Sequence, residues 1–106
     1  MRPVRRVAEL GSLGGMALHF KVRDIFDIRG RGIVALGTIE AGSVCVGARL
    51  FLVSGDTKRE VIVASIEKFE QPSLDEAHAG PDDVGIGLAE ITRDEIQLSD
   101  LLVGQI

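Results

Sequence analysis

Apolar and polar residues alternate along this chain from Leu18 onward, which is the period-2 pattern of half-buried β-strands. Leu18, Phe20 and Val22 share one face of the first stretch, and Phe26 and Ile28 continue the same apolar register. Side chains on a strand point alternately to opposite faces. This register therefore predicts that all five apolar side chains face the same side of one strand.

Further strands are predicted between clusters of turn-forming residues. They cover residues 33–40, 49–54, 59–69, 84–91 and 101–103. Ser54-Gly55-Asp56-Thr57 predicts a hairpin turn, because Gly adopts positive φ readily and Asp bonds the local backbone. Ala41-Gly42-Ser43 is expected to be a turn, residues 72–83 a loop, and residues 92–96 a short polar connection.

Six short strands without a convincing helix predict an all-β sandwich or barrel, and a barrel is favoured because closure removes exposed strand edges. The length of 106 residues indicates one domain, which we place at residues 17–106. Apolar residues make up 45% and aromatic residues only 4%, so the core is expected to consist of Val, Ile, Leu and Ala. Residues 1–16 are expected to be a flexible basic arm.

Charge is unevenly distributed along the chain. The net charge is −4, yet residues 1–66 carry four more basic than acidic residues, and residues 67–106 carry eight more acidic than basic ones. A uniform nucleic-acid-binding surface is therefore not expected, and no DNA partner is predicted. A local basic edge remains open, as does the reading that its members are ordinary solvated side chains. Those members are Arg2, Arg5, Arg6, Lys21, Arg23, Arg29 and Arg31.

The single cysteine, Cys45, excludes an internal disulfide, and it is expected to be a half-buried strand residue. The chain has neither a run of about 18 apolar residues nor a signal-peptide pattern. We therefore expect a cytoplasmic protein without a membrane partner.

Catalytic chemistry is not predicted. His19 and His78 lie far apart in the sequence, and a metal site needs several converging ligands. Gly30-Arg31-Gly32 lacks the Lys and the following helix of a phosphate-binding loop, so its expected role is a tight backbone reversal. The adjacent acidic pairs in predicted loops are expected to be solvated. No catalytic residue, metal or cofactor is expected, and the chain is predicted not to be an enzyme.

Several motifs occur in a characteristic order between residues 20 and 103. They are Asp24-Ile25-Phe26-Asp27-Ile28, the segment 30–42 with the pattern G-R-G-x-V-x-x-G-x-I-E-x-G, Val44-Cys45-Val46-Gly47, Ser65-Ile66-Glu67-Lys68-Phe69, Leu74-Asp75-Glu76-Ala77, Ala79-Gly80 and Val84-Gly85-Ile86. In this order they resemble domain II of translational GTPases, most closely that of elongation factor Tu. The resemblance implies a six-stranded antiparallel Greek-key β-barrel of the translation-factor domain 2 type.

The resemblance also implies a function in binding. In that family the barrel docks against a GTPase domain, and in elongation factor Tu it helps to hold the acceptor end of aminoacyl-tRNA. Glu67 matches a family acid near the terminal adenosine, and Phe69 lies two residues further along the same strand. With Arg29 and Arg31, these residues are the candidate contacts for a partner or RNA. The alternative is that Glu67 is an exposed strand residue and Phe69 belongs to the core.

This sequence departs from the family pattern at three places. Glu70 stands where the family has a basic residue, which disfavours an RNA phosphate there. The loop around residues 79–84 is longer and more acidic, and Leu98-Ser99-Asp100 replaces the usual Arg-Gly. The GTPase motifs do not occur in these 106 residues.

Two functional hypotheses follow. The first is a non-catalytic, translation-factor-like binding module that docks to a protein or RNA partner of the translation machinery. The second is a self-associating structural β-barrel without an RNA role, because a barrel without its usual partner domain can expose an apolar surface. A homo-oligomer is therefore left open.

Overall fold

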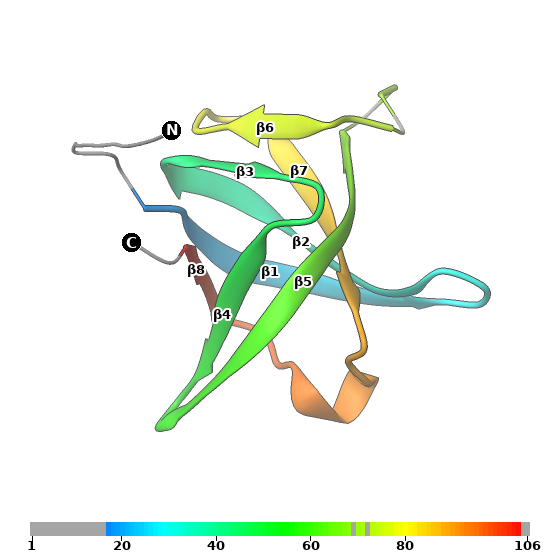
Figure 1. Ribbon diagram of the computed structural model, residues 1–106, viewed down its shortest axis with the longest axis vertical. Coiled ribbons are helices and arrows are strands. Elements are labelled where there is room, and N and C mark those ends of the chain that lie inside the picture. The colour runs from blue at the N-terminus through cyan, green and yellow to red at the C-terminus, as the bar shows by residue number, and fades with distance from the viewer. Residues whose placement is uncertain (1–16, 69, 72, 105–106) are drawn as a thin grey trace, which may run out of the picture.

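The computed structural model describes residues 17–68, 70–71 and 73–104, and these residues form a closed barrel of six antiparallel strands (Figure 1). This confirms the predicted all-β barrel. The barrel strands are β1 (His19–Ile28), β2 (Gly32–Ala41), β4 (Arg49–Ser54), β5 (Thr57–Lys68), β7 (Asp83–Ala89) and β8 (Leu101–Gly104). The predicted arm at 1–16 lies outside the described residues, and so does Phe69. None of the helices in the described part is long and apolar enough to cross a membrane.

The strands follow the order β1-β2-β7-β5-β4-β8 around the barrel, and β8 pairs again with β1. Every pair of neighbours is antiparallel. The hairpin turn between β4 and β5 is Gly55-Asp56, as predicted, with φ of +58° at Gly55. The β1–β2 hairpin is longer than the strands beside it and projects past β7 (Figure 1).

Two short strands were missed by the sequence pattern. The strands β3 (Ser43–Cys45) and β6 (Glu76–His78) pair with each other and lie across one end of the barrel (Figure 1). Val44 and Ala77 occupy the middle of these strands and are buried in the core. Three residues are too few to show alternation, so the prediction of a loop over residues 72–83 was wrong. Cys45 lies in a strand, as predicted, but the prediction of a half-buried side chain was wrong: the side chain is exposed, because Val44 takes the inward position.

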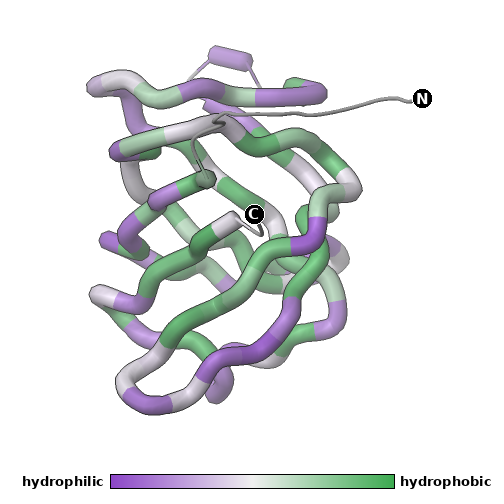
Figure 2. The backbone as a smooth tube through the Cα atoms, turned by 60° about the vertical axis from the view of Figure 1, so that its left-hand side comes forward, coloured by the Kyte–Doolittle hydropathy of each residue, from purple (hydrophilic) through white to green (hydrophobic). Residues whose placement is uncertain are grey.

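The core is built mainly from aliphatic side chains, as the composition predicted, and Phe20 is the aromatic side chain that the described residues contribute to it. Hydrophobic segments follow the strands, while the turns are polar (Figure 2). Ile96 is completely buried although it lies in the predicted polar connection. A short 3₁₀ helix, η1 (Arg93–Glu95), lies there, and Ile96 follows it in extended conformation.

A β-bulge in β1 overturns the predicted orientation of Phe26 and Ile28. Arg23 has no opposite residue, so the alternation of inward and outward side chains shifts by one residue after it. The register on the two sides of the bulge is Val22↔Gly37 and Asp24↔Leu36. Ile25 therefore becomes the buried residue, while Phe26 remains 44% exposed. The alternation alone could not reveal the extra residue.

A second bulge has the same effect in β5. Val63 pairs with Leu88 and Ser65 with Gly87, which leaves Ala64 as the extra residue. Val63 faces the core, and after the bulge Ile66 is the next buried side chain, with 1% exposure. The bulge places Ser65 and Glu67 on the outer face of the barrel. Both bulges thus decide which side chains the outer surface presents.

Deletion of the extra residue tests this role of the bulge. Without Ala64, Val63 stays inward, Ser65 outward and Ile66 inward in regular alternation, so Ile66 and Glu67 keep their faces. Deletion of both Ala64 and Ser65 would instead turn Ile66 outward and the Glu67 carboxylate toward the core. We expect the double deletion, but not the single one, to lower the free energy of unfolding by at least the about 1.5–3 kcal/mol that burial of one large aliphatic side chain contributes. Urea denaturation of both variants measures the difference, and equal stability of the two deletions would contradict the role given to the bulge.

Candidate binding groove

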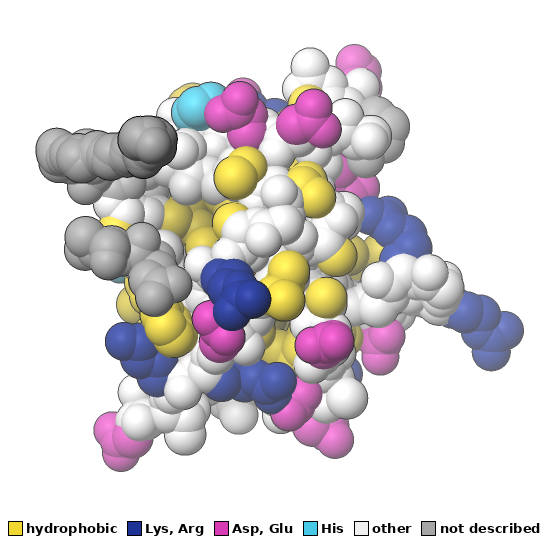
Figure 3. Space-filling model, in the orientation of Figure 1, with side chains coloured by type: hydrophobic (Ala, Val, Ile, Leu, Met, Phe, Trp, Pro, Cys, Tyr) yellow, Lys and Arg dark blue, Asp and Glu magenta, His cyan; other side chains and the backbone are white. Residues whose placement is uncertain are grey.

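A groove of about 370 Å³ lies on the outer face of the barrel, where the β1–β2 hairpin passes β7 and β5. Its lining comes from four strands: Phe26, Ile28, Val34, Leu36, Glu67, Lys68, Asp83 and Gly85. Hydrophobic side chains reach the surface between β5 and the projecting hairpin, beside basic side chains (Figure 3). The groove therefore combines an apolar interior with a charged rim.

The floor of the groove exists because β7 carries glycine on its outer face. Gly85 pairs with Leu36 on one side and with Glu67 on the other. A Cβ atom at Gly85 would lie 3.1 Å from Cγ of Glu67 and 3.3 Å from Cγ1 of Val34. At Gly87, a Cβ would lie only 2.2 Å from Oγ of Ser65. Gly85 thus forms the floor of the groove between side chains of β2 and β5, whereas the Ser65 hydroxyl occupies the space beside Gly87.

The apolar wall comes from the β1–β2 hairpin. Phe26 lies opposite Val34 in the ladder, so their side chains are neighbours on the outer face. Val34 is 4% exposed although it points away from the barrel interior, because the groove residues cover it. Leu36 and Ile28 are half-buried and extend the wall along the hairpin. This wall is suited to an apolar or planar group.

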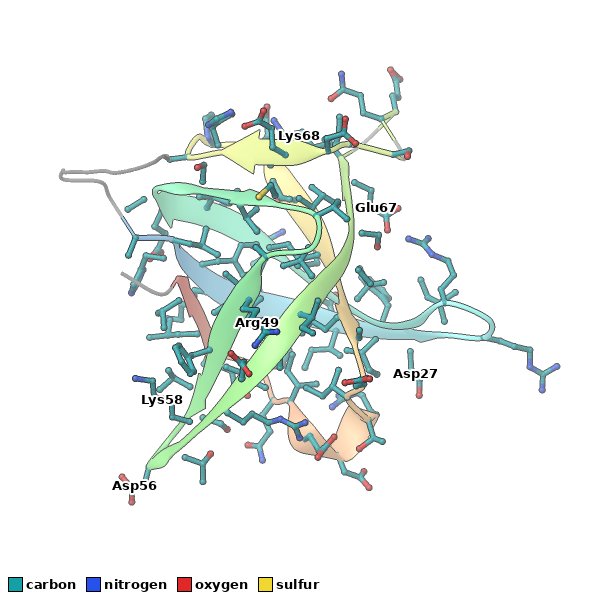
Figure 4. The ribbon with its side chains drawn as sticks, in the orientation of Figure 1. Asp27, Arg49, Asp56, Lys58, Glu67 and Lys68 are labelled. Carbon is teal, nitrogen blue, oxygen red and sulfur yellow. The ribbon has the colours of Figure 1, made fainter. Side chains whose placement is uncertain are left out.

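One ion pair joins the hairpin to the end of β5. A guanidinium nitrogen of Arg31 donates a hydrogen bond to Oε2 of Glu67 at 2.6 Å. Glu67 extends from β5 toward the β1–β2 hairpin (Figure 4). Asp27, which belongs to the hairpin, points to the side away from Glu67. Positive φ at Gly30 and Gly32, +83° and +89°, allows the tight turn that positions Arg31. The sequence had assigned this turn to Gly30-Arg31-Gly32 for the same reason.

The other charged residues that line the groove are paired as well. Arg23 and Asp83 form an ion pair at 2.7 Å, and Lys68 lies 3.8 Å from Asp82. The hydrogen bond from Arg23 lowers the pKa of the Asp83 carboxyl below its ordinary value. Asp83 therefore carries its negative charge at neutral pH and offsets the positive charge of Arg23.

The structure brings two of the four candidate contacts together. Arg31 and Glu67, 36 residues apart in the sequence, form the ion pair at the groove. Glu67 is only 25% exposed, so it is neither a free surface carboxylate nor a core residue. Arg29 is exposed in the same turn but does not line the groove, and Phe69 lies outside the described residues.

Sequence reasoning missed the apolar part of the groove. The alternation predicts an inward Phe26, and Gly85 contributes only to the Val84-Gly85-Ile86 motif. One usable signal was present: Gly85 and Gly87 alternate with buried Val84, Ile86 and Leu88, which marks a strand whose outer face has no side chains at these two central positions.

The two histidines lie away from the groove lining. His19 contacts Glu40 at 2.8 Å, and His78 contacts Glu76 at 3.2 Å. In the part of the chain that the structure describes, no three His, Cys, Asp or Glu side chains gather closely enough to hold a metal ion.

Gly85→Ala tests whether the groove floor tolerates a side chain. The Cβ would press on the flexible Glu67 side chain, and lower unfolded-state entropy would offset part of this crowding by about 0.4–1 kcal/mol. We expect the free energy of unfolding to change by less than about 1 kcal/mol while the groove becomes smaller.

Gly37→Ala is the contrast, because its Cβ would lie 2.1 Å from the backbone oxygen of Lys21, which cannot move aside. For Gly37→Ala we expect the free energy of unfolding to fall by about 1–3 kcal/mol or more. Urea denaturation of both variants measures the difference. Equal losses would show that the Gly85 position is as rigid as Gly37.

A scan against models of known protein families finds no match to this chain. The resemblance to domain II of translational GTPases therefore rests on the ordered motifs, and the groove is interpreted from its own geometry and chemistry.

Proposed function

We propose that this chain is a non-catalytic binding module of the translation-factor domain 2 type, with a Greek-key barrel, that docks to a protein or RNA partner of the translation machinery. The observation that carries this proposal is the glycine-floored groove beside the Arg31–Glu67 ion pair. The groove is where a partner inserts one group, and the paired charges at its rim orient that group.

The dimensions of the groove suit a small inserted group. Its volume of about 370 Å³ is at the lower end of the range for ligand sites, roughly 300–1,000 Å³. An apolar wall with a few polar groups at the rim is the usual composition of such sites. This space is large enough for one ring or one apolar side chain.

The family resemblance supports the same location. It implies that Glu67 lies near the group that the partner inserts, and Glu67 borders the groove. Arg31, which comes from the G-R-G turn of the signature, is its ion-pair partner. Glu67, which lines the groove, and Arg31, which bonds to it, therefore both come from motifs that carry the resemblance.

Phe26→Ala tests the proposal, because it removes most of the apolar wall from the side of the hairpin. We expect the immobilised wild-type chain to retain a translation factor, ribosomal component or tRNA from cell extract. The affinity of the variant for this partner should be at least tenfold lower, because an aromatic anchor contributes about 1.4 kcal/mol or more to the free energy of binding.

Val46→Ala is the matched control, since Val46 is also 44% exposed but does not line the groove. It should retain the same partner at the wild-type level. Retention of one partner by all three proteins would contradict docking through the groove.

Self-association is the second candidate function, and an apolar surface on the opposite part of the barrel favours it. Phe51 pairs with Val103 and Val53 with Leu101 on the outer face of β4 and β8. All four side chains are half-buried, and the ammonium group of Lys58 lies 4.5 Å from the ring centroid of Phe51. Four adjacent apolar side chains on an outer face are typical of an interface.

Light scattering distinguishes this candidate. If the β4–β8 surface joins two copies, the mass should double with increasing concentration, and Val53→Lys should return the chain to a monomer. A monomeric wild-type chain at high concentration would exclude self-association and leave the binding module as the remaining proposal.

A further inference from the structure

The charged residues at the groove are arranged in neutral pairs. Arg31 is paired with Glu67, Arg23 with Asp83, and Lys68 with Asp82, so each positive charge lies beside a carboxylate. A phosphate entering the groove would approach the carboxylates of Glu67 and Asp83, which both line it, at the same time. Nucleic-acid binding derives most of its affinity from unpaired Lys and Arg side chains that neutralise phosphates. The rim is therefore poorly suited to a charged ligand.

The interior of the groove has the opposite character, because its wall consists of carbon. Phe26 and Leu36 present aromatic and branched aliphatic surface, the nearly buried Val34 lies beside the floor, and Gly85 adds no side chain to that floor. Such a surface gains free energy by excluding water from another apolar surface, at about 25 cal/mol per Å². At moderate salt concentration this contribution depends much less on ionic strength than the pairing of charges does.

The Arg31–Glu67 pair adds polar groups that match a peptide backbone. The guanidinium group has five N–H donors, and the bond to Glu67 at 2.6 Å engages one of its terminal nitrogens. The remaining donors can bind a carbonyl oxygen, while the carboxylate can accept a backbone N–H. An uncharged peptide offers both groups beside each side chain.

We propose that the groove takes one aliphatic or aromatic side chain from a protein segment, whose backbone lies against the Arg31–Glu67 pair. This inference rests on the proposed binding function and selects its partner class: a protein, with an uncharged apolar residue as the anchor. The choice of an uncharged apolar anchor rests on two observations: the charges at the rim are paired, and the interior of the groove is apolar.

Titration of the ¹⁵N-labelled chain with blocked amino acids tests this inference. The probes are N-acetyl-leucine amide and N-acetyl-phenylalanine amide, and adenosine 5′-monophosphate is the competing probe. We expect the two amides to shift the backbone signals of Phe26, Leu36 and Gly85 saturably. Their affinity should change less than about twofold when salt is raised tenfold, because no charge is neutralised.

Two variants that each replace a leucine by glutamate test whether the amides bind in the groove. Leu36→Glu places a carboxylate in the apolar wall and should weaken binding of both amides at least tenfold. Leu98→Glu introduces the same charge at a residue that is 58% exposed and outside the groove, and it should leave binding unchanged. Equal effects of the two variants would overturn the assignment to the groove.

The remaining outcomes separate this inference from the proposed function. If adenosine 5′-monophosphate shifts the groove signals and the amides do not, the partner is a nucleotide: the inference fails and the binding module stands. If neither class of probe shifts them up to its solubility limit, the groove binds no inserted group, and both proposals fail.

Discussion

The structure depends on the hydrogen-bond register that closure of the barrel imposes. Each of the six strands pairs with a neighbour on both sides, so the inward and outward positions of every strand are coupled around the ring. A slip of one residue in one strand would exchange its buried and exposed side chains. The bulges at Arg23 in β1 and at Ala64 in β5 produce such an exchange from the bulge onward. In each strand an isoleucine stands at the new inward position. The core remains apolar because Ile25 and Ile66 follow the bulges.

The same two bulges produce the groove on the outer surface. They turn Phe26 and Glu67 outward on the two sides of β7, where Gly85 leaves room between them. Arg31 then reaches Glu67 from the hairpin turn. The two bulges thus keep the core apolar and also place an apolar wall opposite a carboxylate on the outer face.

Electrostatics and packing point to one kind of interaction at this site. The charges at the rim neutralise one another, and the interior is apolar, so the free energy of binding would come from excluded water and a few directed hydrogen bonds. The acidic second half of the chain contributes carboxylates to all three pairs, which explains why its negative charge does not appear as a free acidic surface at the groove.

The sequence by itself determined the fold class, the positions of the six barrel strands and the turn at Gly30-Arg31-Gly32, because alternation and turn residues are local signals. The ordered motifs also singled out Arg31 and Glu67. Tertiary structure alone decided the short pair β3–β6, the exposure of Cys45 and the outward direction of Phe26. Each of these depends on which residue lies opposite across a ladder. A bulge adds one residue to a strand without changing its local composition, so only pairing with the neighbouring strand reveals it.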